Sequence, residues 1–119
     1  MSLTNAIINK IKQSTIPEVV LFSDLDKFPE PPYVVVKPEA GTLLNTRQFR
    51  IIAHDKQGNI EKLENYLMEL DNILLGTLTD EEGTRYKLYA LSYSDISPEP
   101  MDGSYYVERI YYSPLTMRG

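Results

Sequence analysis

The residue types that could carry out catalysis are few in this chain. His54 is the single histidine, and cysteine is absent. Asp55 follows His54, so a carboxylate could orient the imidazole as a general base. A serine hydrolase would also need a nucleophile, and no serine lies in a G-x-S-x-G context. The pattern therefore favours a histidine at a surface strand end over a catalytic one.

Metal and cofactor sites have equally little support in the sequence. A transition-metal site needs several His or Cys ligands at defined spacings, and one histidine cannot supply them. The acidic stretches Asp24-x-Asp26 and Asp80–Gly83 lack the full D-x-[DN]-x-[DN]-G pattern of a calcium loop, so a solvated turn is favoured. The six glycines stand singly and form no phosphate-binding loop. We predict no metal and no cofactor.

Paired carboxylates could serve as a general acid and a general base. The candidates are Asp24, Asp26, Glu61 and Glu64. Such a pair works only when a desolvated cleft moves its pKa values apart, and no pattern in the chain indicates one. The sequence therefore predicts a protein that is not an enzyme.

Composition restricts the partners of the chain. The 119 residues match the commonest size of one domain, so we expect a single domain spanning 1–119. The formal net charge of −5, without a dense basic run, disfavours sequence-specific binding of nucleic acid. No apolar run reaches the ~20 residues of a membrane helix, and the start of the chain lacks a signal-peptide core. The lack of cysteine suits a reducing compartment such as bacterial cytoplasm.

Tyrosine is the unusual feature of the composition. There are nine tyrosines against three phenylalanines and no tryptophan, and four of the nine lie in the stretch 105–112. A strand there places Tyr105, Val107 and Tyr111 on one face and apolar side chains on the other as well. Either one face is core and the other meets a neighbouring subunit, or both are covered within the chain. The candidate subunit interface comprises Tyr89, Tyr93, Tyr105, Tyr106, Ile110, Tyr111 and Tyr112.

Hydrophobic periodicity predicts the elements that must position these residues. A three-four spacing predicts a long helix over 60–75, and a shorter repeat predicts a helix over 3–14. Alternation and β-branched runs predict strands at 19–22, 33–36, 47–54, 85–93 and 105–112. We therefore expect an α+β fold: a mainly antiparallel sheet of four to five strands, one long helix packed on a face, and a short N-terminal helix.

Local signals mark the ends of these elements. Asn59 is positioned to cap the long helix, and Gly76 stands where a left-handed C-cap is expected. Pro38 is expected to end the second strand. Loops are predicted at 23–32, 39–45 and 94–103, and a polar turn at 79–83.

The order and patterning of these elements resemble the small neck and tail proteins of tailed bacteriophages, the tail-terminator, tail-completion and head–tail joining group. The resemblance covers nearly the whole chain. It rests on the N-terminal helix and on the segments PPYVVVKPE, RQFRIIAHD, NIEKLENYLMELDNILLG and YYVERIYYSPL. These segments contain no diagnostic motif, so no functional residue is carried over by position.

The resemblance implies a structural protein without catalytic activity. Such proteins assemble into rings, often hexamers, that end the tail tube or join it to the head connector. The expected partners are further copies of this chain and tail-tube or connector proteins. The expected location is the host bacterial cytoplasm during assembly and then the virion. An acidic ring lumen would let DNA pass without binding tightly, since like charges repel.

A second hypothesis remains open on the sequence alone. The acidic, cysteine-free composition also suits a cytoplasmic ligand-binding or regulatory α+β module, whose ligand would occupy a pocket between helix and sheet. A third hypothesis is an enzyme that uses His54 with Asp55 or with an acidic loop. It would also need a nucleophile, and the chain has neither a cysteine nor a serine in a G-x-S-x-G context.

Overall fold

The computed structural model describes seven stretches of the chain: residues 3–16, 18–24, 32–40, 46–56, 59–94, 96–98 and 104–114. Within them, the side chains of residues 24, 40 and 93 are not described. These residues form two α-helices, seven strands and a 3-10 turn, η1 (Phe22–Asp24). The helices are α1 (Leu3–Lys12) and α2 (Ile60–Leu74). The strands are β1 (Val19–Leu21), β2 (Tyr33–Ala40), β3 (Thr46–Lys56), β4 (Gly76–Thr79), β5 (Arg85–Tyr93), β6 (Ser97–Pro98) and β7 (Ser104–Pro114). The expected α+β class is confirmed.

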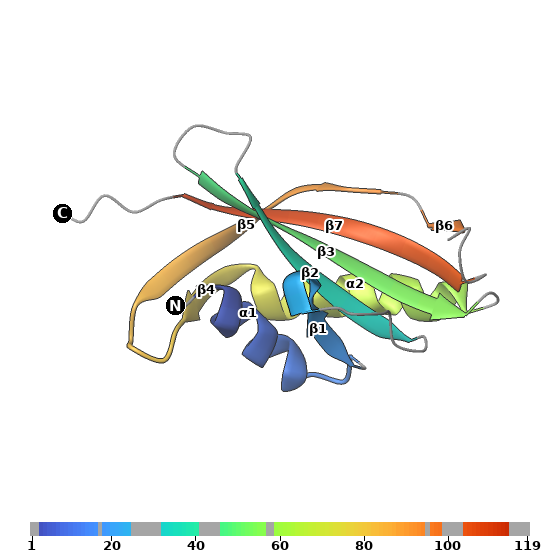
Figure 1. The fold of residues 1–119 in the computed structure, drawn as a ribbon, viewed down its shortest axis with the longest axis horizontal. Helices are drawn as coiled ribbons and strands as arrows, with labels where there is room; N and C mark the ends of the chain where they lie inside the picture. The colour runs from blue at the N-terminus through green and yellow to red at the C-terminus, as the bar shows by residue number, and fades with distance from the viewer. Residues whose placement is uncertain are drawn as a thin grey trace.

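A single sheet carries the fold, in the order β1-β2-β3-β7-β5-β4, with β6 paired to β7 (Figure 1). β1 runs parallel to β2, whereas the other pairs are antiparallel. The sheet is therefore mixed and has seven strands, not the four to five expected. The central pair is long: β3 and β7 match residue for residue from Thr46↔Pro114 to Lys56↔Ser104, a span of about 33 Å at about 3.3 Å per residue.

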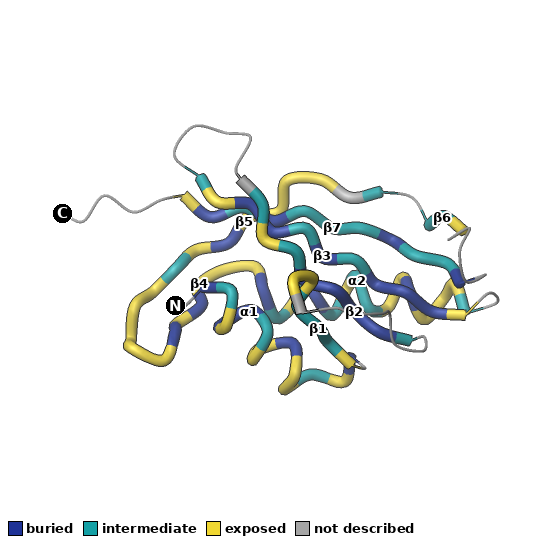
Figure 2. The backbone as a smooth tube through the Cα atoms, viewed as in Figure 1, coloured by how far each residue is buried: buried dark blue, intermediate teal, exposed yellow. Residues whose placement is uncertain are grey.

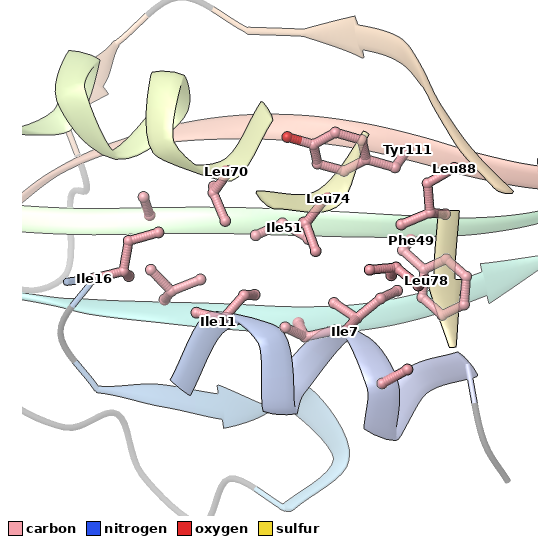
Figure 3. Close-up of a cluster of buried hydrophobic side chains, with 14 of the residues drawn as sticks. Ile7, Ile11, Ile16, Phe49, Ile51, Leu70, Leu74, Leu78, Leu88 and Tyr111 are labelled. Carbon is pink, nitrogen blue, oxygen red and sulfur yellow. The ribbon is translucent and has the colours of Figure 1, made fainter. Parts of the chain in front are cut away.

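Both helices cover the same face of the sheet, which we call the inner face. The apolar stripe of α1 (Leu3, Ile7 and Ile11) and that of α2 (Leu63, Leu70 and Leu74) are fully buried. They join one core cluster with inner-facing strand residues such as Val34, Val36, Phe49, Ile51, Ala53, Leu88, Val107 and Tyr111 (Figure 3). Three-four spacing in the helices and alternation in the strands produce this core, as predicted. The opposite face, the outer face, has no helix on it among the described residues.

Pro38 does not end β2, contrary to expectation. The Val34 amide donates to the Glu18 carbonyl on the β1 side, so alternate residues 36 and 38 also direct their backbone nitrogens to that side. The β1 register stops at Leu21↔Val36. Pro38 therefore lies where no described strand needs an N–H donor, and the strand continues to Ala40 while pairing with β3.

Two short strands were not predicted. β4 contains one buried residue, Leu78, and is held by pairing with β5. β6 comprises two residues within the predicted loop 94–103 and pairs with Tyr105 and Tyr106 of β7. Such short elements have no periodicity of their own and form only because a partner strand is present.

The predicted boundaries of α2 are nearly correct, but the capping differs in detail. Asn59 occupies the N-cap position without a side-chain cap. Its side-chain Nδ2 donates to Asp55 Oδ1 instead, at 3.0 Å. Gly76 has the positive φ of +107° that suits glycine, yet it begins β4, and the C-cap is Leu75 in an extended conformation. Among the described residues, no helix is both long and apolar enough to cross a membrane.

Candidate interaction surface

The two faces of β7 have different roles. Tyr105, Val107 and Tyr111 alternate onto the inner face, where Val107 and Tyr111 are buried and Tyr105 packs against the core. Tyr111 has no exposed surface. Its inclusion in the candidate subunit interface is therefore corrected, because α2 of the same chain covers it. Tyr105 is likewise a helix-side residue with partial burial.

Tyr111 belongs to a polar cluster that joins α2 to β7. Its hydroxyl donates to Asp71 Oδ1 at 2.7 Å, and the Arg109 guanidinium donates to both carboxylate oxygens of Asp71. Burial, with the hydrogen bond to Asp71, raises the pKa of the Tyr111 phenol, so it stays protonated as a donor. The hydrogen bonds to Asp71 also raise the pKa of Arg109. This cluster fixes the helix against the sheet.

The outer face carries two further tyrosines of β7, Tyr106 and Tyr112, together with Tyr89 of β5. Tyr106, Ile110 and Tyr112 alternate onto it and are partly exposed. Tyr89 of β5 pairs with Tyr112, and their rings stack with centroids 5.3 Å apart. Tyr89 is 40% exposed, a high fraction for an aromatic side chain on a sheet. Four of the seven predicted interface residues thus lie on the outer face and keep exposed surface, whereas Tyr33, Val35 and His54 on the same face are buried. Figure 2 shows how buried and partly exposed residues follow one another along β7.

Tyr93 departs from the predicted alternation of β5. A register shift lies between Ala90 and Ser92, as in a β-bulge. After it, Tyr93 pairs with the inner-face residue Arg109, whereas Tyr89 pairs with outer-face Tyr112. The side chain of Tyr93 lies outside the described residues.

His54 is buried, with 5% exposure, and is not a surface strand-end residue as predicted. Its ring stacks between Tyr33 of β2, at 4.4 Å, and Tyr106 of β7, at 5.8 Å. Both partners are its cross-strand neighbours on the outer face. The sequence could not reveal this environment, because the two neighbours of His54 lie 21 and 52 positions away along the chain. Three stacked rings stiffen the part of the outer face that contains Tyr106.

A network of charges crosses the outer face between the aromatic groups. Arg50 donates to Glu39 at 2.9 Å and to Glu108 at 2.7 Å, and Gln48 donates to Glu39 at 3.0 Å. The hydrogen bond from Arg50 is the main cause that lowers the pKa of Glu39, outweighing its partial burial. The network ties β2, β3 and β7 together and neutralises most of its own charge.

This network predicts a pH dependence of stability. Because the folded pKa of Glu39 lies below its ordinary value of 4.5, its contribution is fully present above about pH 4.5 and is lost as the pH falls through the lowered pKa. We expect the urea midpoint to fall between pH 5 and pH 3, and Glu39→Gln to flatten that fall. Glu18→Gln, at an exposed position, serves as the control. An identical pH profile for wild type and Glu39→Gln would contradict the assignment.

Two other acids that the sequence singled out, Asp55 and Asp80, accept several hydrogen bonds each. Asp55 is 1% exposed, and its carboxylate accepts hydrogen bonds from the Lys56 amide, Asn59 and the Tyr66 hydroxyl. Asp80 accepts from the amides of Glu82 and Thr84 and from the Tyr86 hydroxyl, which organises the predicted turn. These two carboxylates thus stabilise the local backbone conformation through hydrogen bonds from backbone amides. Within the described stretches, no group of three His, Cys, Asp or Glu could hold a metal ion.

Glu61 and Glu64 are exposed on α2 and line neither of the two grooves described below. Asp26, and the side chain of Asp24, lie outside the described residues.

Two open grooves lie at the same end of the sheet. One of about 360 Å³ is lined by Thr77, Arg85, Tyr86, Lys87, Tyr89 and Pro114. Another of about 340 Å³ is lined by Thr4, Pro38, Glu39, Arg47, Gln48 and Phe49. The first groove continues the outer face, because Lys87 pairs with Thr77 and Tyr89 with Tyr112. Sequence reasoning missed this groove, although the alternation of Arg85, Lys87 and Tyr89 along one strand was a signal for it.

Comparisons with known proteins bear on the fold alone. No protein-family model matches the chain, and no curated protein matches it. Eleven chains of solved structures match. One of them aligns with 98% of this chain and 93% of its own length, at a TM-score of 0.61 and 13% sequence identity. At that identity the likeness shows a shared fold, present in a chain of nearly the same extent.

Proposed function

We propose that this protein is a non-enzymatic structural assembly protein of a phage or prophage neck or tail, which self-associates into a ring that ends the tail or joins it to the head. The observation that carries the proposal is the outer face of β5 and β7, where Tyr89, Tyr106, Ile110 and Tyr112 are uncovered by either helix. A solvated sheet face is ordinarily more polar than this one. Tyrosine, with an apolar body and a polar tip, is enriched at protein interfaces.

The rigidity of the outer face supports the same proposal. The Tyr89–Tyr112 stack, the Tyr33–His54–Tyr106 stack and the Arg50 network hold the side chains in place before any partner arrives. Binding by an ordered surface loses less side-chain entropy than binding by a mobile one. The element order that resembles phage neck and tail proteins indicates which kind of assembly this surface would serve.

A pair of matched variants tests the proposal. Tyr89→Ala removes a ring that is 40% exposed on the outer face, and Phe22→Ala removes one that is 43% exposed on η1. If self-association uses the outer face, Tyr89→Ala should raise the dissociation constant about tenfold or more, as truncation of an interface anchor does. Phe22→Ala should leave it within about twofold.

The measurement is sedimentation velocity across a concentration series, with circular dichroism confirming that both variants are folded. Equal association by wild type and Tyr89→Ala would contradict the use of this face. A strictly monomeric wild type, combined with stabilisation by a small metabolite in a thermal-shift screen, would favour the ligand-binding hypothesis instead.

A further inference from the structure

The groove at the end of the outer face differs in charge from the rest of this acidic chain. Arg85 and Lys87 are exposed and alternate onto the outer face beside Tyr89, with Lys87 Nζ 6.0 Å from the centre of the Tyr89 ring. The described lining residues include these two cations and no carboxylate. Pro114 and Thr77 complete an amphipathic surface. The groove therefore suits a segment that presents both carboxylates and an apolar side chain.

The exposed face of α2 is such a segment. Glu61, Glu64 and Met68 follow a three-four spacing on the side of the helix opposite Leu63 and Leu70. Glu61 and Glu64 are exposed, and Met68 is 65% exposed, the highest value among the exposed large hydrophobic residues. A methionine on a tyrosine-lined surface makes favourable sulfur–aromatic contacts. This face of α2 complements the groove in both charge and polarity.

The groove and the acidic part of α2 lie at opposite ends of the molecule. The groove is next to Pro114, where β7 ends and β3 begins at Thr46. Glu61 lies in the first turn of α2, which follows the far end of β3 at Lys56. Figure 1 places these ends at the left and the right of the view. One molecule therefore cannot close this contact upon itself, whereas two copies in line can.

We infer that the Arg85–Lys87 groove of one copy docks the Glu61–Glu64–Met68 face of α2 of the next copy, in a head-to-tail contact. The inference rests on the proposed function: it gives the end of the outer face that carries Tyr89 a partner surface on α2 of the next copy. A symmetric groove-to-groove contact would bring Arg85 and Lys87 against their own copies, and the like charges would repel. A heterologous contact pairs opposite charges, and repeated heterologous contacts close into a ring when the rotation allows.

Charge reversal with complementation tests the inference. Variant A carries Arg85→Glu and Lys87→Glu, and variant B carries Glu61→Lys and Glu64→Lys. Each alone should show at least roughly tenfold weaker self-association at ~50 mM salt, where charge interactions are weakly screened. An equimolar mixture should recover the assembly, because each groove then faces an α2 of opposite charge. Lys10→Glu with Lys12→Glu, on the exposed surface of α1, is the control for a change in net charge and should associate like wild type.

The outcomes separate the inference from the proposed function. If wild type assembles and both A and B assemble equally well, this contact is wrong while the ring proposal stands. If A and B dissociate but their mixture stays dissociated, the groove binds something other than α2, and the inference is again overturned. If wild type remains a monomer at every concentration, both the contact and the proposed function fail. Recovery in the mixture supports the head-to-tail contact.

Discussion

Replacing Tyr111 by alanine is expected to lower the free energy of unfolding by about 3–5 kcal/mol, the range for truncating a large buried aromatic side chain. Tyr111 is fully buried between α2 and the sheet. Truncation leaves a cavity there and removes the hydroxyl that donates to Asp71. Domains of this size have a total stability of about 5–15 kcal/mol, so the variant should be marginally folded. Urea unfolding followed by circular dichroism measures the change.

Two further variants separate the causes of that loss. Tyr111→Phe keeps the ring and removes only the donor to Asp71, and we expect a loss of about 1–2 kcal/mol. Tyr112→Ala truncates the neighbouring tyrosine on the outer face, which is partly exposed, and should cost about 1–2 kcal/mol through the lost stack with Tyr89. Equal destabilisation by Tyr111→Ala and Tyr112→Ala would contradict the division of β7 into a core face and an open face.

Replacing Asp71 by alanine is the second change with a large expected effect. It leaves Arg109 without the carboxylate that accepts two of its hydrogen bonds and leaves the buried Tyr111 hydroxyl without its acceptor. An unsatisfied buried polar group costs about 1–3 kcal/mol, and a broken, fully buried ion pair costs about 3–5 kcal/mol. The Arg109 and Asp71 side chains are 15% and 26% exposed, so solvent screens part of the loss. We expect a total of about 2–4 kcal/mol.

Asn72→Ala is the matched control for Asp71→Ala, because Asn72 is the next residue of the helix and is exposed. It should change stability by less than about 0.5 kcal/mol. Thermal and urea unfolding of the two variants under identical conditions give the comparison. An Asp71→Ala variant as stable as Asn72→Ala would show that the cluster does not hold α2 against β7.

The sequence predicted the elements whose burial has a clear period. Alternation in β3 correctly placed Phe49, Ile51 and Ala53 in the core, and the three-four stripe of α2 correctly placed Leu63, Leu70 and Leu74. Ile60 lies three positions before Leu63, so the same three-four spacing includes it, but it is the first residue of the helix and is 44% exposed. Periodicity indicates the direction in which a side chain points. It does not indicate whether another helix or strand packs against that side chain.

Features that depend on pairing between distant segments were not predictable. Nothing local to His54 indicates that Tyr33 and Tyr106 flank its ring. The register shift at Leu91 moves the side chains that follow it in β5 to the opposite face of the sheet. A single extra residue in a strand cannot be recognised from the amino-acid composition. For the same reason, the sequence could not show that Tyr111, unlike Tyr112 beside it, faces the core.

We propose that this chain acts by associating with copies of itself through its outer face. Sedimentation velocity of the wild-type protein over a wide concentration range tests the claim most directly. We expect a single discrete oligomer to grow at the expense of the 13.7 kDa monomer as concentration rises, since a closed ring has a fixed number of subunits. A mass of 13.7 kDa at every concentration would contradict it.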